Sequence, residues 1–182
     1  MNIVHFTAMK DGTAEEYRML NTLEREFAVN LPCRLLQALQ RLDSSLEGYR
    51  VSRLTHSLQT ATRAERDGAD AEMIAAALLH DLGDEFAPHN HAALAAEIIR
   101  PYVRPQITWI VAQHGVFQAY YYAHHLGGDR NARDALRGHV WFKDCADFCE
   151  NWDQASFDPE YDTLPLSHFE PLLKEVFGDR KK

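Results

Sequence analysis

Apolar residues recur every three or four positions along most of the chain, as they do on one face of an α-helix. Leu54, Leu58 and Ala61 show this spacing. Runs that alternate apolar and polar residues, typical of half-buried strands, are nearly absent. The pattern therefore predicts an all-α protein.

Capping and helix-breaking residues set the expected bounds of these helices. Thr13-Ala-Glu-Glu16 has the form of a capping box and predicts a helix to Phe27. Residues 115–138, rich in Tyr, Gly, Arg and Asp, are expected to form an ordered loop or short helices. The other helices are expected over residues 31–43, 53–67, 70–82, 91–102, 105–114 and 139–152, with a short one near the C-terminus.

Length and composition narrow the class of protein. The chain has 182 residues and no repeat or linker, so we expect a single domain over 1–182, with N-terminal helices 13–45 packed on a core of 46–177. A net charge of -8 provides no basic surface for nucleic acid. Without a signal-like or membrane-length apolar run, we expect a cytoplasmic protein with no membrane partner, and no protein partner is evident.

The most informative segment is residues 77–91, which read ALLHDLGDEFAPHNH. His80 and Asp81 follow a wholly apolar run, where a carboxylate is unfavourable unless it is paired or coordinated to a metal. Imidazole and carboxylate are common ligands of first-row metal ions, and an aspartate can bridge two of them. We therefore expect a metal site at this pair.

Further candidate ligands lie near predicted helix ends in the apolar central region. They are His56, His91, His114 and Asp153. Each of these histidines alone could be a packed core or surface residue, and the aspartate could pair with an arginine. His89 competes with His91, which is favoured because it begins a predicted helix and is better fixed there.

The ordered set His56, His80-Asp81 and Asp153 resembles the H…HD…D signature of the HD-domain superfamily, an all-helical fold with metal at the centre of a helix bundle. Because His91 and His114 lie between the HD pair and the last aspartate, the set resembles the dinuclear branch. The segments VSRLTHSLQTATRA, AALLHDLGD, FQAYYYAHHLGGDRNAR and FCENWDQASFDP look most similar to mixed-valent diiron oxygenases of the PhnZ and TmpB type, relatives of myo-inositol oxygenase.

This resemblance covers about residues 46–177 and implies an HD-domain bundle with a central dinuclear site. One iron would be held by His56, His80, Asp81 and Asp153, and the other by Asp81, His91 and His114. The resemblance also implies an Fe(II)/Fe(III) pair with O2 as co-substrate. The reaction would cleave the C–P bond of a 1-hydroxy-2-(trimethyl)aminoethylphosphonate to phosphate and a carboxylic acid, glycine betaine or glycine.

Catalytic positions are expected at the bridging Asp81, at Tyr49 and at Asp84. Tyr49 departs from the relatives because they carry Tyr-x-x-Glu before the first ligand, a pattern that is broken in this chain. Asp84 departs because some relatives have His three residues after the HD aspartate. Expected substrate-binding residues are Gln118, Tyr121, Tyr122, His125, Arg130 and Arg133. Tyrosine rings suit a quaternary ammonium group and an arginine fork suits a phosphonate, although adjacent tyrosines also pack and loop arginines are often solvated.

Two other functions compete with the oxygenase. A metal-dependent HD phosphohydrolase acting on nucleotides or phosphomonoesters would work without O2, and His91 and His114 argue against it. A non-catalytic helical domain with a vestigial metal site is the third possibility. Occupation of every expected ligand position argues against that one.

Overall fold

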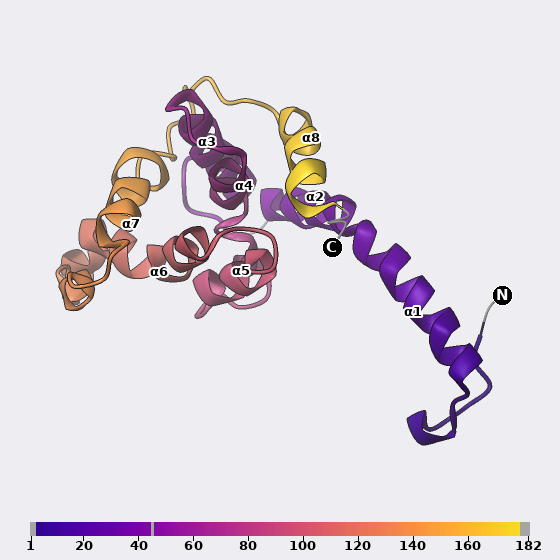
Figure 1. Cartoon of the computed structure of the whole chain (residues 1–182). Coiled ribbons are helices and arrows are strands. Elements are labelled where there is room, and N and C mark those ends of the chain that lie inside the picture. Colours follow the sequence, from indigo (N-terminus) through magenta and orange to yellow (C-terminus); the bar gives the residue numbers. More distant parts are fainter. Residues whose placement is uncertain (1–2, 45, 179–182) are drawn as a thin grey trace.

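The computed structural model describes residues 3–44 and 46–178. This part of the chain contains no strand, which confirms the all-α prediction. The α-helices are α1 (Ala14–Val29), α2 (Leu31–Arg41), α3 (Arg53–Arg66), α4 (Ala71–Leu79), α5 (His91–Ile99), α6 (Pro105–Tyr122), α7 (Phe142–Phe148) and α8 (Leu166–Phe177) (Figure 1). Short 3-10 turns occur at Met9–Asp11, Leu42–Ser44, Leu82–Glu85, Ala123–Leu126 and Ala132–Leu136, and a π-helical turn at Cys149–Asp153.

Helix α4 lies at the centre of the bundle. Its residues from Ile74 to Leu79 are all buried, as expected for a helix that is apolar on every side. It packs against α3, α6 and α8, while α5 packs on α6 and α7 covers the other end of α6. Because α4 is buried and packed on these helices, the His80 and Asp81 side chains that follow it lie inside the bundle.

Among the described residues, no helix is both long and apolar enough to cross a bilayer.

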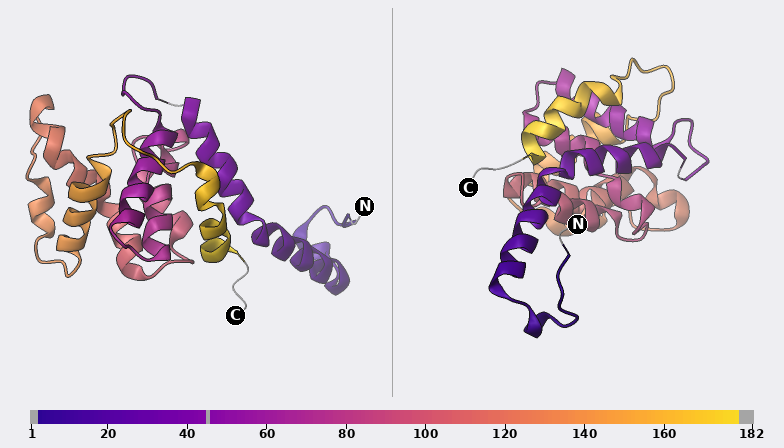
Figure 2. Two further views of the ribbon diagram at one scale, coloured as in Figure 1. Left: turned by 90° about the horizontal axis from the view of Figure 1, so that it is seen from above. Right: turned by 90° about the vertical axis from the view of Figure 1, so that its right-hand side faces the viewer.

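The N-terminal helices differ in how they contact this core. Helix α2 packs on α3 and α8 and buries Leu35 and Leu39. Helix α1 has the predicted capping box at Thr13 and Glu16 but no buried residue, and it extends away from the bundle in every view (Figures 1 and 2). Helix α2 therefore packs on the bundle, whereas α1 is rich in exposed Glu and Arg. The division of the chain into N-terminal helices 13–45 and a core of 46–177 stays a prediction.

Helix α6 is longer than its sequence pattern predicts. The predicted end at His114 is wrong, because the helix continues through Gly115 to Tyr122 and buries Phe117. A Cβ at Gly115 would lie 4.0 Å from His91 Nε2, an ordinary van der Waals contact, so this glycine lies beside the His91 ring. The 3-10 turns after Tyr122 agree with the alternative expectation of short helices.

Gly83 brings the 3-10 turn after Asp81 against the start of α5. A Cβ at this position would lie 2.4 Å from the backbone oxygen of His91 and 2.7 Å from its Cα. Both atoms belong to the backbone and cannot move aside as a flexible side chain would. The glycine therefore allows the close approach that places His91 beside the HD pair.

Replacing Gly83 by Ala should destabilise the metal-free protein by about 1–3 kcal/mol, the usual effect of overpacking. Urea denaturation would measure this change. Gly138→Ala is the matched control, because nothing lies within 4 Å of an added Cβ there. Equal stability of the two variants would contradict the close-approach argument.

Candidate metal centre

Ionisable side chains from separate helices converge inside the bundle. His56 comes from α3, His80 caps α4, His91 begins α5 and His114 lies in α6. Asp81 follows His80 and shares its burial. Together with Asp153, these side chains form overlapping groups of possible metal ligands whose donor atoms lie within 4.8 Å of one another, namely His56–His80–Asp81, His80–His114–Asp153 and Asp81–His91–His114.

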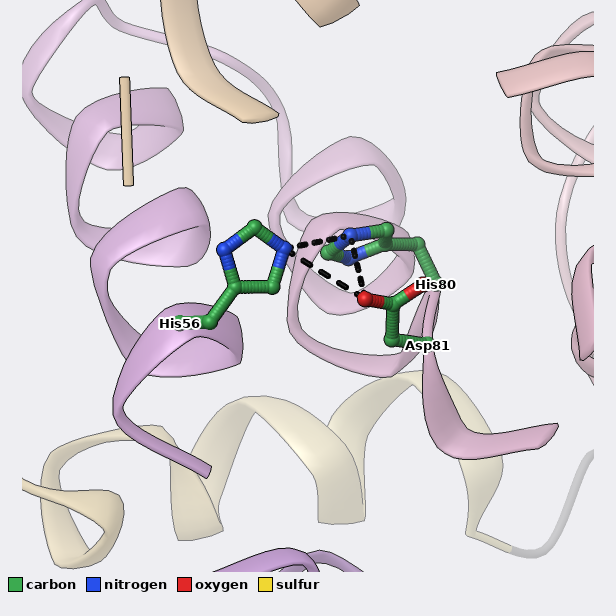
Figure 3. Close-up of side chains that lie close together, drawn as sticks. All are labelled: His56, His80 and Asp81. Carbon is green, nitrogen blue, oxygen red and sulfur yellow. Dashed lines mark hydrogen bonds and ion pairs between the residues drawn. The ribbon is translucent and has the colours of Figure 1, made fainter. Parts of the chain in front are cut away.

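The first group is built around two facing imidazoles (Figure 3). Nδ1 of His56 donates to the carbonyl oxygen of Ser156 at 3.0 Å, and Nδ1 of His80 donates to that of Ala77 at 2.8 Å. Because a carbonyl oxygen only accepts, each Nδ1 carries a proton, and in the neutral form of each ring Nε2 has the lone pair. The two Nε2 atoms nevertheless lie 3.1 Å apart, an arrangement that a cation stabilises.

A second pair of imidazoles repeats this arrangement. His91 Nε2 and His114 Nε2 lie 3.3 Å apart, and His114 Nδ1 donates to the Val111 carbonyl oxygen at 2.7 Å. Asp81 lies between the two pairs. Its Oδ2 is 3.4 Å from His56 Nε2, and its Oδ1 is 3.2 Å from His114 Nε2 and 3.4 Å from His91 Nε2. One carboxylate thus faces both pairs, with a different oxygen toward each.

Asp153 completes the first group from the far end of the chain. Its Oδ1 is 3.3 Å from His56 Nε2 and accepts a hydrogen bond from Gln118 Nε2 at 3.0 Å. Its Oδ2 is buried and has no hydrogen-bond partner. The backbone N–H of Gln154 donates to the Cys149 carbonyl oxygen, closing a π turn of the kind often found at functional sites. This turn places the carboxylate inside the bundle.

The electrostatics of these groups favour positive charge at their centre. Burial lowers the pKa of His56, but hydrogen bonds with Asp153 and Asp81 outweigh it and raise that pKa to about 10. Burial raises the pKa of Asp81, whereas the charge of His80 and a hydrogen bond with His114 hold it well below its usual range. Convergent lone pairs, paired carboxylates and an unsatisfied buried oxygen together fit the ligand chemistry of first-row metal ions.

Comparison with protein families agrees with this geometry. Residues 53–139 match the model of the HD domain family. The chain contains an HD domain. The matched segment includes Asp81 and the four clustered histidines, which are His56, His80, His91 and His114. Asp153 follows the segment. No curated protein matches the chain. HD domains are typically metal-dependent enzymes, so this domain with its buried His/Asp cluster suggests a metal-dependent enzyme of the HD kind.

The two competing histidines of the HD domain differ in position. His91 belongs to the group Asp81–His91–His114, whereas His89 is exposed and belongs to none of the ligand groups found among the described residues. The geometry therefore favours His91 as the ligand, in line with its place at the start of a helix.

A cavity of about 280 Å³ opens onto the cluster. Three of the expected substrate-binding residues, Gln118, Tyr121 and Tyr122, line it, and Tyr49 does so as well. Asp84 does not line this cavity. It lies behind the cluster, with Oδ1 3.3 Å from His91 Nδ1. The remaining lining residues are Arg53, His56, Asp81, His91, His114, Gly115, Asp153, Gln154 and Phe157.

The other three expected substrate-binding residues lie away from this cavity. Arg130 and Arg133 stack over the ring of Tyr120, at 4.2 Å and 3.7 Å from its centroid. His125 is exposed and lies against His124. The arginines thus stack on an aromatic ring outside the cavity, none of the three lines it, and their role in substrate binding stays a prediction.

Arg53 is a lining residue that the sequence did not indicate as a site residue. Its Nη1 donates to Asp81 Oδ2 at 3.3 Å, and its Nε lies 3.1 Å from Asp84 Oδ2. Among the described lining residues it is the only Lys or Arg. Arg53 precedes His56 by three residues, and residues at this spacing share a helix face. This spacing is the feature of the sequence that could have placed Arg53 beside the ligands.

Phe157 is a second lining residue that the sequence reasoning missed. Its ring stacks on His56 at 4.4 Å and on Tyr49 at 5.1 Å between centroids. It therefore joins an aromatic wall of the cavity to a proposed metal ligand. Its place in the segment FDP gave no periodic signal.

We expect His91→Ala to lower the metal content by about one ion per chain, because it removes a donor from the group Asp81–His91–His114. His89→Ala should leave the content unchanged. Elemental analysis of both variants, purified identically with iron, makes the comparison. A loss in the His89 variant alone would show that the ligand is misassigned.

Metal removal should also destabilise the domain, since an ion that binds only the folded state stabilises it by about 2.7 kcal/mol at one hundred times its Kd. Thermal unfolding with and without a chelator measures this difference. Asp81→Ala is the control. Its melting temperature should hardly respond to the chelator, because the shared donor is gone.

Proposed function

We propose that the protein is an O2-dependent diiron oxygenase that cleaves the C–P bond of a 1-hydroxy-2-(trimethyl)aminoethylphosphonate. The observation that carries this proposal is the position of Asp81, whose two oxygens face separate imidazole pairs. A carboxylate in this position suits a bridge between two ions. The products are phosphate and glycine betaine, or glycine when the amine is not methylated.

The proposed ligands divide into two sets that share Asp81. His56, His80 and Asp153 complete the first set, and His91 and His114 complete the second. Histidine and carboxylate ligands accept several first-row metals, so iron is proposed because the reaction is an oxidation by O2. When bound, an Fe(II)/Fe(III) pair supplies the redox chemistry, and the side chains supply geometry and charge.

The reaction balances without a further reductant. One hydroxyphosphonate and one O2 give one carboxylic acid and one phosphate. The C–P bond breaks, C1 is oxidised to the level of a carboxylic acid, and both atoms of O2 enter the products. Four electrons pass from the substrate to O2, so no organic cofactor is needed.

Arg53 supports the binding of an anionic group next to the ligands. It lines the cavity, and its side chain is only 16% exposed. A guanidinium group can donate in parallel to two oxygens of a phosphonate. In the proposed complex Arg53 orients the phosphonate with C1 toward the ions.

The aromatic wall supports recognition of the other end of the substrate. A trimethylammonium group has no N–H to donate, so its recognition relies on ring faces and negative charge. Tyr49, Tyr121, Tyr122 and Phe157 line the cavity. Tyr120 is left out of the proposed recognition site because its ring is occupied by Arg130 and Arg133.

A phosphohydrolase is the second candidate function. The same Arg53 beside the same ligands would also suit a phosphomonoester, and HD domains are typically metal-dependent enzymes. Hydrolysis needs water in place of O2. The two candidate functions therefore differ in whether the reaction requires O2, which an experiment can supply or exclude.

With iron-loaded protein, we expect the hydroxylated trimethylammonio-phosphonate to release phosphate and glycine betaine only when O2 is present. Phosphorus NMR and O2 consumption give the stoichiometry, which should be one to one. Phosphate release from phosphomonoesters under anaerobic conditions would favour the hydrolase. If no hydroxylated aminoalkylphosphonate releases phosphate, the oxygenase proposal fails.

Arg53→Gln should lower kcat/KM by about 10- to 100-fold, because a charge-assisted hydrogen bond is worth about 1.5–3 kcal/mol. Arg130→Gln is the control and should retain near wild-type kinetics, since its guanidinium stacks outside the cavity. Metal content is measured in both variants to separate substrate binding from metal loss. The reverse order of effects would restore Arg130 as the anion-binding residue.

A further inference from the structure

The two ligand groups of the centre are built unequally. The first offers donors from His56, His80, Asp81 and Asp153, which are all buried. The second offers donors from Asp81, His91 and His114, and the side chain of His91 is 27% exposed. The second group therefore has fewer protein donors and is more open to solvent.

The histidines also differ in what holds their second ring nitrogen. Nδ1 of His56, His80 and His114 donates to a backbone carbonyl at 3.0, 2.8 and 2.7 Å. Nδ1 of His91 is 3.5 Å from the Pro88 carbonyl oxygen, too long for a strong bond, and 3.3 Å from Asp84 Oδ1. His91 is thus the one of the four whose Nδ1 faces a carboxylate.

Asp84 is itself held from the other side. Its Oδ2 lies 3.1 Å from Arg53 Nε, and the two side chains are 13% and 16% exposed. This ion pair offsets part of the carboxylate charge, and Arg53 Nε and Asp84 Oδ2 form no hydrogen bond with each other. A carboxylate that accepts the N–H of a ligating imidazole fixes the ring and makes its other nitrogen a stronger donor.

We propose that Asp84 is a positioning residue for the second ion and that this ion binds more weakly than the first. The proposal rests on the two-ion centre proposed above. Without Asp84, the ring of His91 can turn on the exposed side of the cluster, while the buried ligands of the first ion keep their backbone hydrogen bonds. The occupancy of the second site then depends on the supply of free metal, and a two-ion reaction depends on it too.

The test is an equilibrium titration of metal-free protein with Mn²⁺, in which EPR reports the free ion. The wild type should bind two ions in steps that differ by at least about tenfold in Kd. Asp84→Ala should keep the first step and weaken the second by about 10- to 100-fold, the usual effect of losing such a partner. Glu85→Gln is the matched control in the same turn, because Glu85 pairs with Arg41 instead of a ligand.

Several results would overturn the proposal. The wild type could bind a single ion, or two ions with equal affinity. The Asp84→Ala variant could bind both ions as the wild type does, or bind both with equally reduced affinity. Circular dichroism checks folding, and Asp84→Asn, which keeps the shape and loses the charge, replaces the alanine variant if that variant is unfolded. The titration contains no substrate and no O2, so a failed oxygenase assay leaves its outcome unaffected.

Discussion

The structure depends on how it accommodates lone pairs and carboxylates that face one another inside an apolar bundle. In their neutral forms His56 and His80 cannot satisfy each other, because both Nδ1 protons go to backbone carbonyls and the two Nε2 atoms face each other without a proton. Asp81 and Asp153 add negative charge at the same place. Buried groups of this kind are strongly unfavourable alone and favourable around a shared cation. This constraint favours the close convergence of the helices that carry these side chains.

Local backbone features bring the ligands together. The apolar helix α4 carries His80 and Asp81 to the centre, and Gly83 lets the following turn touch the start of α5. The π turn before Gln154 rotates Asp153 inward. The backbone of these segments does not itself supply a metal donor atom. Each one determines where a donor atom lies, so the chemistry of the site is encoded in helix ends and turns as much as in the ligands themselves.

The sequence predicted the elements of the bundle well where periodicity and caps agreed. It indicated the cluster because a His-Asp pair after an apolar run is unfavourable without a partner. It did not predict the contacts of the arginines, since nothing local shows that Arg130 and Arg133 stack on Tyr120 or that Arg53 lies beside Asp81. It also ended α6 too early, because Gly115 resembles a helix stop in the sequence although the helix continues through it. These failures concern contacts between distant segments.

The position of Asp153 has a consequence for the order in which the protein matures. Among the clustered donors it lies beyond the matched HD segment, and its Oδ1 returns to His56 on α3. A shared ion would therefore tie the beginning of the bundle to its end, closing a long loop whose entropy grows only slowly with length. During synthesis, a chain that has emerged only through α6 carries every other donor but cannot close this tie. An ion held by all of these donors would therefore find its ligand set complete only after the π turn has been synthesised.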